Sequence, residues 1–197
     1  MNVLLRLINA FRCLPGVGPK SAQRLAYHLL QNNRHKGLHL ADCLTEAMQQ
    51  VVHCQRCNNY TIETICGICQ HSGRDTRLLC VVESPSDLNA IEQTGAYSGN
   101  YYVLMGRLSP LDGIGPQQLS LAKLENIVAE GVINELILAL SPTVEGQTTV
   151  QFIKNMLESH KINITQPAQG IPVGGELEFL DSNTISNALR NRTVFLE

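Results

Sequence analysis

Four cysteines in the first half of the chain constrain its fold more than any other feature of the sequence. Cys54 and Cys57 form one C-x-x-C pair, and Cys66 and Cys69 form a second pair after eight intervening residues. Four thiolates at this spacing close a tetrahedron around Zn²⁺, with each pair on its own turn. Two disulfides or a redox-active C-x-x-C are the alternatives, but a reduced compartment opposes the first and the second needs only one pair. The sequence therefore predicts one structural zinc ion per chain.

The segment 54–76 around these cysteines is mostly polar, so metal binding is expected to supply most of its folding energy. All four ligand positions are filled by protein, which leaves no open position for catalysis. His53 and His71 flank the cysteines and are expected to lie at the surface or to support the ligands. The other three cysteines lie on apolar faces and are expected in the core: Cys13, Cys43 and Cys80.

From Leu78 onward, short apolar runs alternate with amphipathic segments. The runs predict strands at 78–82, 101–105, 134–140 and 162–166. The segments between them predict helices at 84–95, 120–131 and 148–160. This alternation is typical of a parallel or mostly parallel sheet that is covered by helices. The last part of the chain predicts a Gly-rich turn, a short helix and a terminal apolar piece, TVFLE.

The first 52 residues predict three amphipathic helices, at about 3–13, from Pro19 onward, and at about 38–52. The string LPGVGPK separates the first two of these helices. Gly16 and Gly18 allow a positive φ and a close backbone approach, and Pro19 suits the first turn of a helix. This pattern predicts a helix-hairpin-helix; an ordinary helical hairpin with a Pro/Gly turn is the alternative.

The charge of the chain is distributed unevenly. Six Lys and Arg and no Asp or Glu occur in residues 1–41, so this segment is +6 and the other 156 residues are −8, for a net charge of −2. The amino end of a helix binds phosphate through its free N–H groups, and Lys20 and Arg24 would add charge-assisted contacts. The sequence therefore predicts that Gly16, Gly18, Lys20 and Arg24 bind DNA without sequence preference.

The amino-terminal segment has the pattern of an amphipathic helix and not of a signal peptide. There is also no run of 18 apolar residues, so no membrane span or membrane partner is expected. These features predict a cytoplasmic location.

The order of these parts, with the strings SPLDGIGP and PVGGELE, resembles the RecR family of bacterial recombination mediators over the full length of the chain. The resemblance implies an α+β fold of several modules. These are a helix-hairpin-helix module (1–53), a four-cysteine zinc finger (54–76), an α/β Toprim domain with a mostly parallel sheet (77–172) and a carboxyl-terminal oligomerisation segment (173–197).

The same resemblance implies a non-catalytic role in recombinational DNA repair at the nucleoid. Members of the family act with RecO and, in another pathway, with RecF. They help to load the recombinase onto single-stranded DNA that is coated with single-strand-binding protein. The family forms ring-like tetramers, so the resemblance also implies a homo-oligomer able to encircle single- or double-stranded DNA.

Catalytic Toprim domains hold magnesium with a Glu after the first strand and a D-x-D after a later one. Glu83 matches the first position, but Ser141 and Thr143 stand where the two Asp residues would be, followed by Glu145. Hydroxyls are poor substitutes for anionic ligands on Mg²⁺. We therefore interpret the domain as non-catalytic. The alternatives are a metal-dependent nuclease, topoisomerase or primase, and a zinc-dependent scaffold that does not contact DNA.

Glu83, Asp87 and Glu145 are expected near the carboxyl ends of the strands, where α/β folds bind ligands. They would dock a basic partner such as RecO or retain a weak metal site; solvated surface acids are the alternative. The sequence has no phosphate-cradling G-x-x-x-x-G-K-[ST] loop. Gln166 and Gln169 also stand where many relatives carry a basic residue, so the sequence gives little support to nucleotide binding near the carboxyl end.

Overall fold

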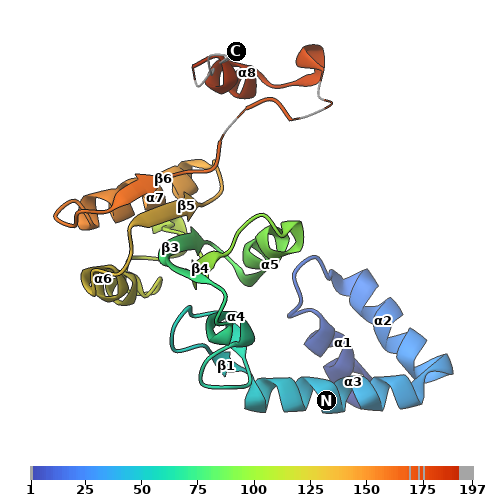
Figure 1. The fold of residues 1–197 in the computed structure, drawn as a ribbon. Helices are drawn as coiled ribbons and strands as arrows, with labels where there is room; N and C mark the ends of the chain where they lie inside the picture. The colour runs from blue at the N-terminus through green and yellow to red at the C-terminus, as the bar shows by residue number, and fades with distance from the viewer. Residues whose placement is uncertain (1, 169, 173, 175, 191–197) are drawn as a thin grey trace. The chain divides into compact units, whose positions relative to one another are not determined.

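The computed structural model describes residues 2–168, 170–172, 174 and 176–190 (Figure 1). The chain divides into two compact units, Met1–Val52 and His53–Glu197. Within the described ranges, none of the helices is both long and apolar enough to cross a membrane.

The first unit consists of three helices, as predicted: α1 (Val3–Phe11), α2 (Pro19–Asn32) and α3 (Arg34–Gln50). The side chain of Asn2 accepts a hydrogen bond from the Leu4 N–H and caps α1. Ala22 and Ala26 of α2 are fully buried, which lets neighbouring helices approach closely. α3 begins at Arg34 and not at Leu38, so Gly37 lies inside the helix, where its N–H donates to the Asn33 carbonyl at 2.9 Å. The helix continues through Gly37 despite the weak helix propensity of glycine.

The cysteine segment is built from very short elements. Strands β1 (Val52–His53) and β2 (Tyr60–Thr61) form a two-stranded ribbon, and α4 (Gly67–Gln70) is a single turn of helix. Elements of this size cannot bury a core of their own. The segment therefore depends on its cysteines and on its contacts with the larger sheet.

The larger sheet has four strands in the order β4-β3-β5-β6, and every pair is parallel. This confirms the predicted mostly parallel sheet. The strands are β3 (Asp75–Val82), β4 (Gly99–Val103), β5 (Glu135–Ala139) and β6 (Asn163–Thr165).

Three helices connect these strands and cover both faces of the sheet. They are α5 (Pro85–Thr94), α6 (Leu121–Ala129) and α7 (Val144–Met156). α5 begins and ends as predicted, with a Ser84 cap and with Gly95 at φ +64°. α7 begins earlier than the predicted position 148, because the Thr143 side chain accepts a hydrogen bond from the Gly146 N–H and caps the helix there.

Side chains along β3 alternate between two apolar cores. Leu79 and Val81 pack in the core that α6 and α7 cover, whereas Cys80 and Val82 pack with Leu88 of α5. Right-handed crossovers place helices on opposite faces when the chain reverses its direction across the sheet. The chain moves from β3 to β4 and then back to β5 and β6, so the direction of winding changes between β3 and β5.

Arg74 and Glu92 tie the amino end of β3 to α5. The two side chains form an ion pair, and the Arg74 guanidinium also donates to the Gly99 carbonyl at 2.8 Å. The Tyr101 hydroxyl donates to Glu92 Oε1 at 2.7 Å, and Arg74 lies over the Tyr101 ring. This partly buried network connects β3, α5 and β4.

The remaining elements are the 3₁₀ turns η1 (Pro110–Asp112) and η2 (Leu177–Phe179) and the helix α8 (Ser182–Arg190). In η1 the Asp112 carboxylate accepts a hydrogen bond from the Ser109 hydroxyl at 2.6 Å. α8 confirms the predicted short helix near the carboxyl end. The apolar piece TVFLE and Gln169 lie outside the described residues.

Candidate nucleic-acid interface and metal centre

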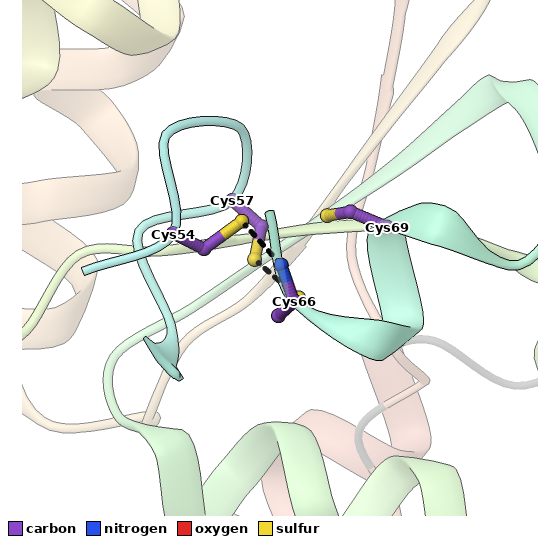
Figure 2. A group of neighbouring side chains, drawn as sticks. All are labelled: Cys54, Cys57, Cys66 and Cys69. Carbon is purple, nitrogen blue, oxygen red and sulfur yellow. Dashed lines mark hydrogen bonds between the residues drawn. The ribbon is translucent and has the colours of Figure 1, made fainter. Parts of the chain in front are cut away.

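The four predicted zinc ligands lie together. The sulfur atoms of Cys54, Cys57, Cys66 and Cys69 are all within 4.8 Å of one another, and all four residues are buried. Figure 2 shows the four side chains, which come from the turn after β1 and from α4 and the residue before it. Among the described residues, this is the one group of three or more potential ligands that is close enough to hold a metal ion. Four sulfur donors fit a tetrahedral soft or borderline metal.

The pKa values of three of these thiols are shifted, and not all in the same direction. Burial raises the pKa of Cys54, but N–H groups of Cys57, Cys66 and Arg56 outweigh it and lower the pKa to about 6. The Cys66 N–H lies 3.3 Å from Cys54 Sγ (Figure 2). Burial raises the pKa of Cys66 to about 11, and the pKa of Cys57 is also raised, by the neighbouring Cys69 sulfur and by burial. An incoming cation would displace the protons that these thiols hold.

The turn between Cys54 and Cys57 is attached to the main sheet at Val103. The Val103 N–H donates to the Cys57 carbonyl at 2.8 Å, and the Asn58 side chain donates to the Val103 carbonyl at 2.7 Å. Asn58 has φ +65°, a conformation that Asn tolerates better than most residues. These bonds fix the position of the cysteine group relative to β4. The sequence pattern did not identify Asn58, although Asn at the turn of a C-x-x-C pair is a usable signal.

The two flanking histidines lie outside the cysteine group. His53 Nδ1 is 3.0 Å from the Asn58 carbonyl, and His71 Nδ1 accepts the Gly73 N–H at 3.1 Å. Each ring therefore supports a turn next to the cysteines.

The other three cysteines were expected in the core, and one of the three is buried there. Cys80 is buried in β3, and burial raises its pKa to about 12. Cys13 and Cys43 are exposed, so their assignment to the core was wrong. Cys13 follows the end of α1, and Cys43 lies near His39 on an exposed side of α3 with sulfur and Nε2 3.6 Å apart. Helical spacing alone did not distinguish these sides from the packed ones.

The hairpin between α1 and α2 presents an uncapped helix end. Gly16 has φ +76°, and the Val17 N–H donates to the Leu14 carbonyl at 3.2 Å to close the turn. Gly18 is the N-cap residue of α2, no side chain caps this end, and Pro19 follows. The first N–H groups of a helix have no partner within it, so those of Lys20 and Ser21 are available to an anion.

Open space surrounds this end of the helix. A Cβ placed on Gly18 would meet nothing within 4 Å. Lys20 and Arg24 are both exposed, one turn apart, and no carboxylate among the described residues lies within ion-pair distance of either. The residues predicted to bind phosphate therefore share one accessible end of α2.

Glu83 bridges the carboxyl ends of β3 and β5, where the direction of winding changes. Its Oε1 accepts the Ser141 N–H at 2.8 Å, and its Oε2 lies 3.5 Å from an Arg107 nitrogen. Glu83 is 9% exposed and Arg107 is partly exposed. Arg107 belongs to none of the predicted site residues; its signal in the sequence is a lone cation just after β4, at the same end of the parallel sheet.

The backbone around this position is tightly packed. A Cβ on Gly146 would lie 2.0 Å from the Ser141 carbonyl oxygen and 3.2 Å from Glu83. The hydroxyl of Thr143, which stands at one of the two Asp positions, is used to cap α7.

Asp87 and Glu145 have different surroundings from Glu83. Asp87 Oδ2 accepts hydrogen bonds from the Ser84 N–H and hydroxyl at 2.9 and 2.8 Å, which completes the capping box of α5. Glu145 lies in the first turn of α7 and is partly exposed. The three acids do not form a three-ligand group among the described residues.

Comparison with known proteins assigns the chain to a family. Three family descriptions match in order: "RecR, helix-hairpin-helix" at residues 4–48, "Toprim domain" at 77–168 and "RecR, C-terminal" at 170–193. Proteins named "Recombination protein RecR" from Legionella pneumophila subsp. pneumophila (strain Philadelphia 1) and from L. pneumophila strains Corby and Lens are each 59% identical over 194 residues. These matches cover 98% of both chains. The chain belongs to the RecR family.

Membership in the RecR family confirms the predicted order of helix-hairpin-helix, cysteine cluster and Toprim domain. The "RecR, helix-hairpin-helix" match includes Gly16, Gly18, Lys20 and Arg24, and the Toprim match includes Glu83, Ser141 and Arg107. The four cysteines lie between the helix-hairpin-helix match and the Toprim match.

Proposed function

We propose that this protein is a recombination mediator that binds DNA without sequence preference and performs no chemistry on it. The hairpin between α1 and α2 would bind the phosphate backbone. In line with the family resemblance, the protein would act with RecO and RecF to load the recombinase onto DNA coated with single-strand-binding protein. It would do so as a homo-oligomer, with a ring-like tetramer as the expected state.

The open, uncapped and cationic end of α2 carries this proposal. Free N–H groups and the helix dipole favour an anion there, and Lys20 and Arg24 supply positive charge on the same end. Contacts of this kind involve phosphate and not base edges, so they place a protein on DNA without selecting a sequence.

The Toprim domain would serve as a binding surface. Glu83, the one acid that matches the catalytic pattern, is already held by the Ser141 N–H and lies beside the Arg107 guanidinium. An adjacent guanidinium supplies the positive charge that a divalent cation would otherwise bring. Asp87 and Glu145, which are partly exposed, are proposed to face a basic partner such as RecO, with the buried Glu83 behind them.

The cysteine group would hold one zinc ion per chain with a structural role. Metal bound to Cys54, Cys57, Cys66 and Cys69 would fix the turns that hydrogen-bond to Val103. All four donors come from the protein, so the ion would have no free position for substrate.

The DNA contact is tested by fluorescence anisotropy with a labelled duplex over a range of salt concentrations. The variants are Lys20→Ala and Arg24→Ala, with Lys36→Ala on α3 as a control that removes the same charge elsewhere. We expect each hairpin variant to lose about tenfold in affinity and to lower the slope of log affinity against log salt by about one. Equal affinity of wild type and both hairpin variants would rule out the hairpin as the DNA contact.

Non-catalysis is tested by incubating supercoiled and linear DNA with the protein and Mg²⁺. We expect no change in length or topology. Cleavage or relaxation that disappears in Glu83→Gln would instead establish the alternative, a metal-dependent phosphoryl-transfer enzyme.

A further inference from the structure

One exposed side of α2 carries more than the two phosphate-binding cations. Lys20, Arg24, Tyr27 and Gln31 follow one another at helical spacing, each three or four residues after the last. Together with Gln23 and His28, they line a shallow, open depression of about 480 Å³ that begins at the hairpin and runs along the helix. We call these six residues the α2 strip.

Tyr27 is the central ring of the α2 strip. Its side chain is 40% exposed, and its hydroxyl accepts a hydrogen bond from Gln23 Nε2 at 3.1 Å. This bond restrains the ring from the preceding turn. His28 is also exposed, and its Nε2 lies 3.1 Å from Asn33 Nδ2. Tyr27 and His28 follow Arg24 by three and four residues, so each ring is a neighbour of the planar Arg24 guanidinium on the helix surface.

Flat side chains next to phosphate-binding cations suit unpaired nucleotides. Aromatic rings and guanidinium groups stack on bases of any sequence, and each stacked base contributes about tenfold or more to affinity. In a duplex the base faces are already stacked on each other, so only unpaired bases are available to a ring. The acid-free composition of residues 1–41 adds charge complementarity along the whole strip.

We propose that the α2 strip binds a single-stranded DNA segment, with Tyr27 stacked on a base and with Lys20 and Arg24 on the flanking phosphates. This inference rests on the proposed DNA-binding function and adds the preferred form of the nucleic acid. The hairpin end would bind backbone in either form, whereas Tyr27 would favour an unpaired strand.

The test compares Tyr27→Leu with Tyr27→Phe. Leucine keeps an apolar side chain but removes the ring, and phenylalanine keeps the ring but removes the hydroxyl. Binding is measured by anisotropy on a labelled oligothymidylate and on a duplex of equal length. Tyr27→Leu is expected to weaken single-strand binding about tenfold with an unchanged salt slope, and to leave duplex binding within about twofold. Tyr27→Phe is expected to retain single-strand binding.

A second measurement does not depend on the variants. Photo-crosslinking of wild-type protein to an oligonucleotide that contains 5-iododeoxyuridine is expected to give a modified peptide that includes Tyr27. Equal losses on both DNA forms in Tyr27→Leu, or crosslinks only outside α2, would overturn the proposal. A wild-type chain that binds neither form at any salt concentration would overturn the DNA-binding function itself, which separates the two failures.

Discussion

At the scale of single residues, the two glycines of the hairpin have different roles. Gly16 has φ +76°, where a side chain is strained whatever the surrounding space. Gly18 has φ −77°, which any residue adopts, and a Cβ there would point into open space. The fold therefore requires glycine at position 16, whereas at position 18 glycine leaves the backbone accessible.

This difference predicts that Gly16→Ala and Gly18→Ala separate folding from binding. Gly16→Ala is expected to lower the free energy of unfolding by about 1–2 kcal/mol, because alanine is strained at positive φ. Gly18→Ala is expected to change it by less than about 1 kcal/mol, since a less flexible unfolded chain offsets a poorer N-cap. Urea denaturation measures both. In the anisotropy assay Gly18→Ala should nevertheless weaken DNA binding, because its methyl group covers the helix end.

At position 146, glycine is required by the atoms packed around it and not by its backbone conformation. A Cβ at this position would lie 2.0 Å from the Ser141 backbone oxygen, which cannot move as a flexible side chain can. We expect Gly146→Ala to lower the free energy of unfolding by about 3 kcal/mol, at the upper end for overpacked sites. The control is Gly95→Ala, which has strained φ but open space and should cost less. Equal costs for the two variants would contradict the packing argument.

At the scale of secondary-structure elements, the Arg74–Glu92–Tyr101 network holds α5 to the sheet. Burial raises the pKa of Glu92, but hydrogen bonds from Arg74 and Tyr101 outweigh this and hold the pKa below its usual value. A lowered pKa means that the carboxylate stabilises the fold above the unfolded pKa of about 4.3. That contribution is lost as pH falls through the lower, folded value.

We therefore expect acid to reduce the stability of the wild type more steeply than that of Glu92→Gln below about pH 4. Urea midpoints of both proteins from neutral to acidic pH provide the measurement. Release of the proposed metal from the cysteines would affect both proteins alike, so the difference between the two curves isolates Glu92. Parallel curves would show that Glu92 does not carry this pH dependence.

Most elements of this fold were predictable from the sequence, because strand and helix periods alternate clearly after Leu78. The grouping of the four cysteines was predictable from their spacing alone. The start of α7 did not follow from the apolar periodicity, because the helix start is set by the polar cap of Thr143 and not by an apolar residue. The Glu83–Arg107 pair was missed because the two residues come together only when β3 and β4 are adjacent in the sheet. Exposure of Cys13 and Cys43 depends on helix packing that periodicity does not specify.

At the scale of the whole molecule, the seven cysteines fall into three classes of accessibility. Cys13 and Cys43 are exposed, the four clustered cysteines are buried together, and Cys80 lies in the core with its pKa raised to about 12. Thiolates, and not thiols, react with alkylating reagents. Alkylation of the four clustered cysteines should therefore report whether they hold a metal, and alkylation of Cys80 should report whether the core is folded.

We expect a maleimide to modify Cys13 and Cys43 in the metal-loaded protein, the four clustered cysteines only after chelation, and Cys80 only after denaturation. Intact-mass spectrometry counts the adducts at each stage, and peptide mapping assigns them. Cys13→Ser with Cys43→Ser is the matched control and should show no adduct until the chelator is added. Modification of the cluster without chelation would contradict a metal held by four thiolates.

The attachment of the cysteine turns at Val103 has a consequence for solubility. β4 is the outermost strand on its side of the sheet, and strands with free outer edges recruit strands from other molecules. Cys57 and Asn58 occupy the outward N–H and carbonyl of Val103. Loss of the metal that we propose for the cysteine group would therefore expose a template for intermolecular β-pairing, so metal depletion would lead to self-association and not only to loss of function.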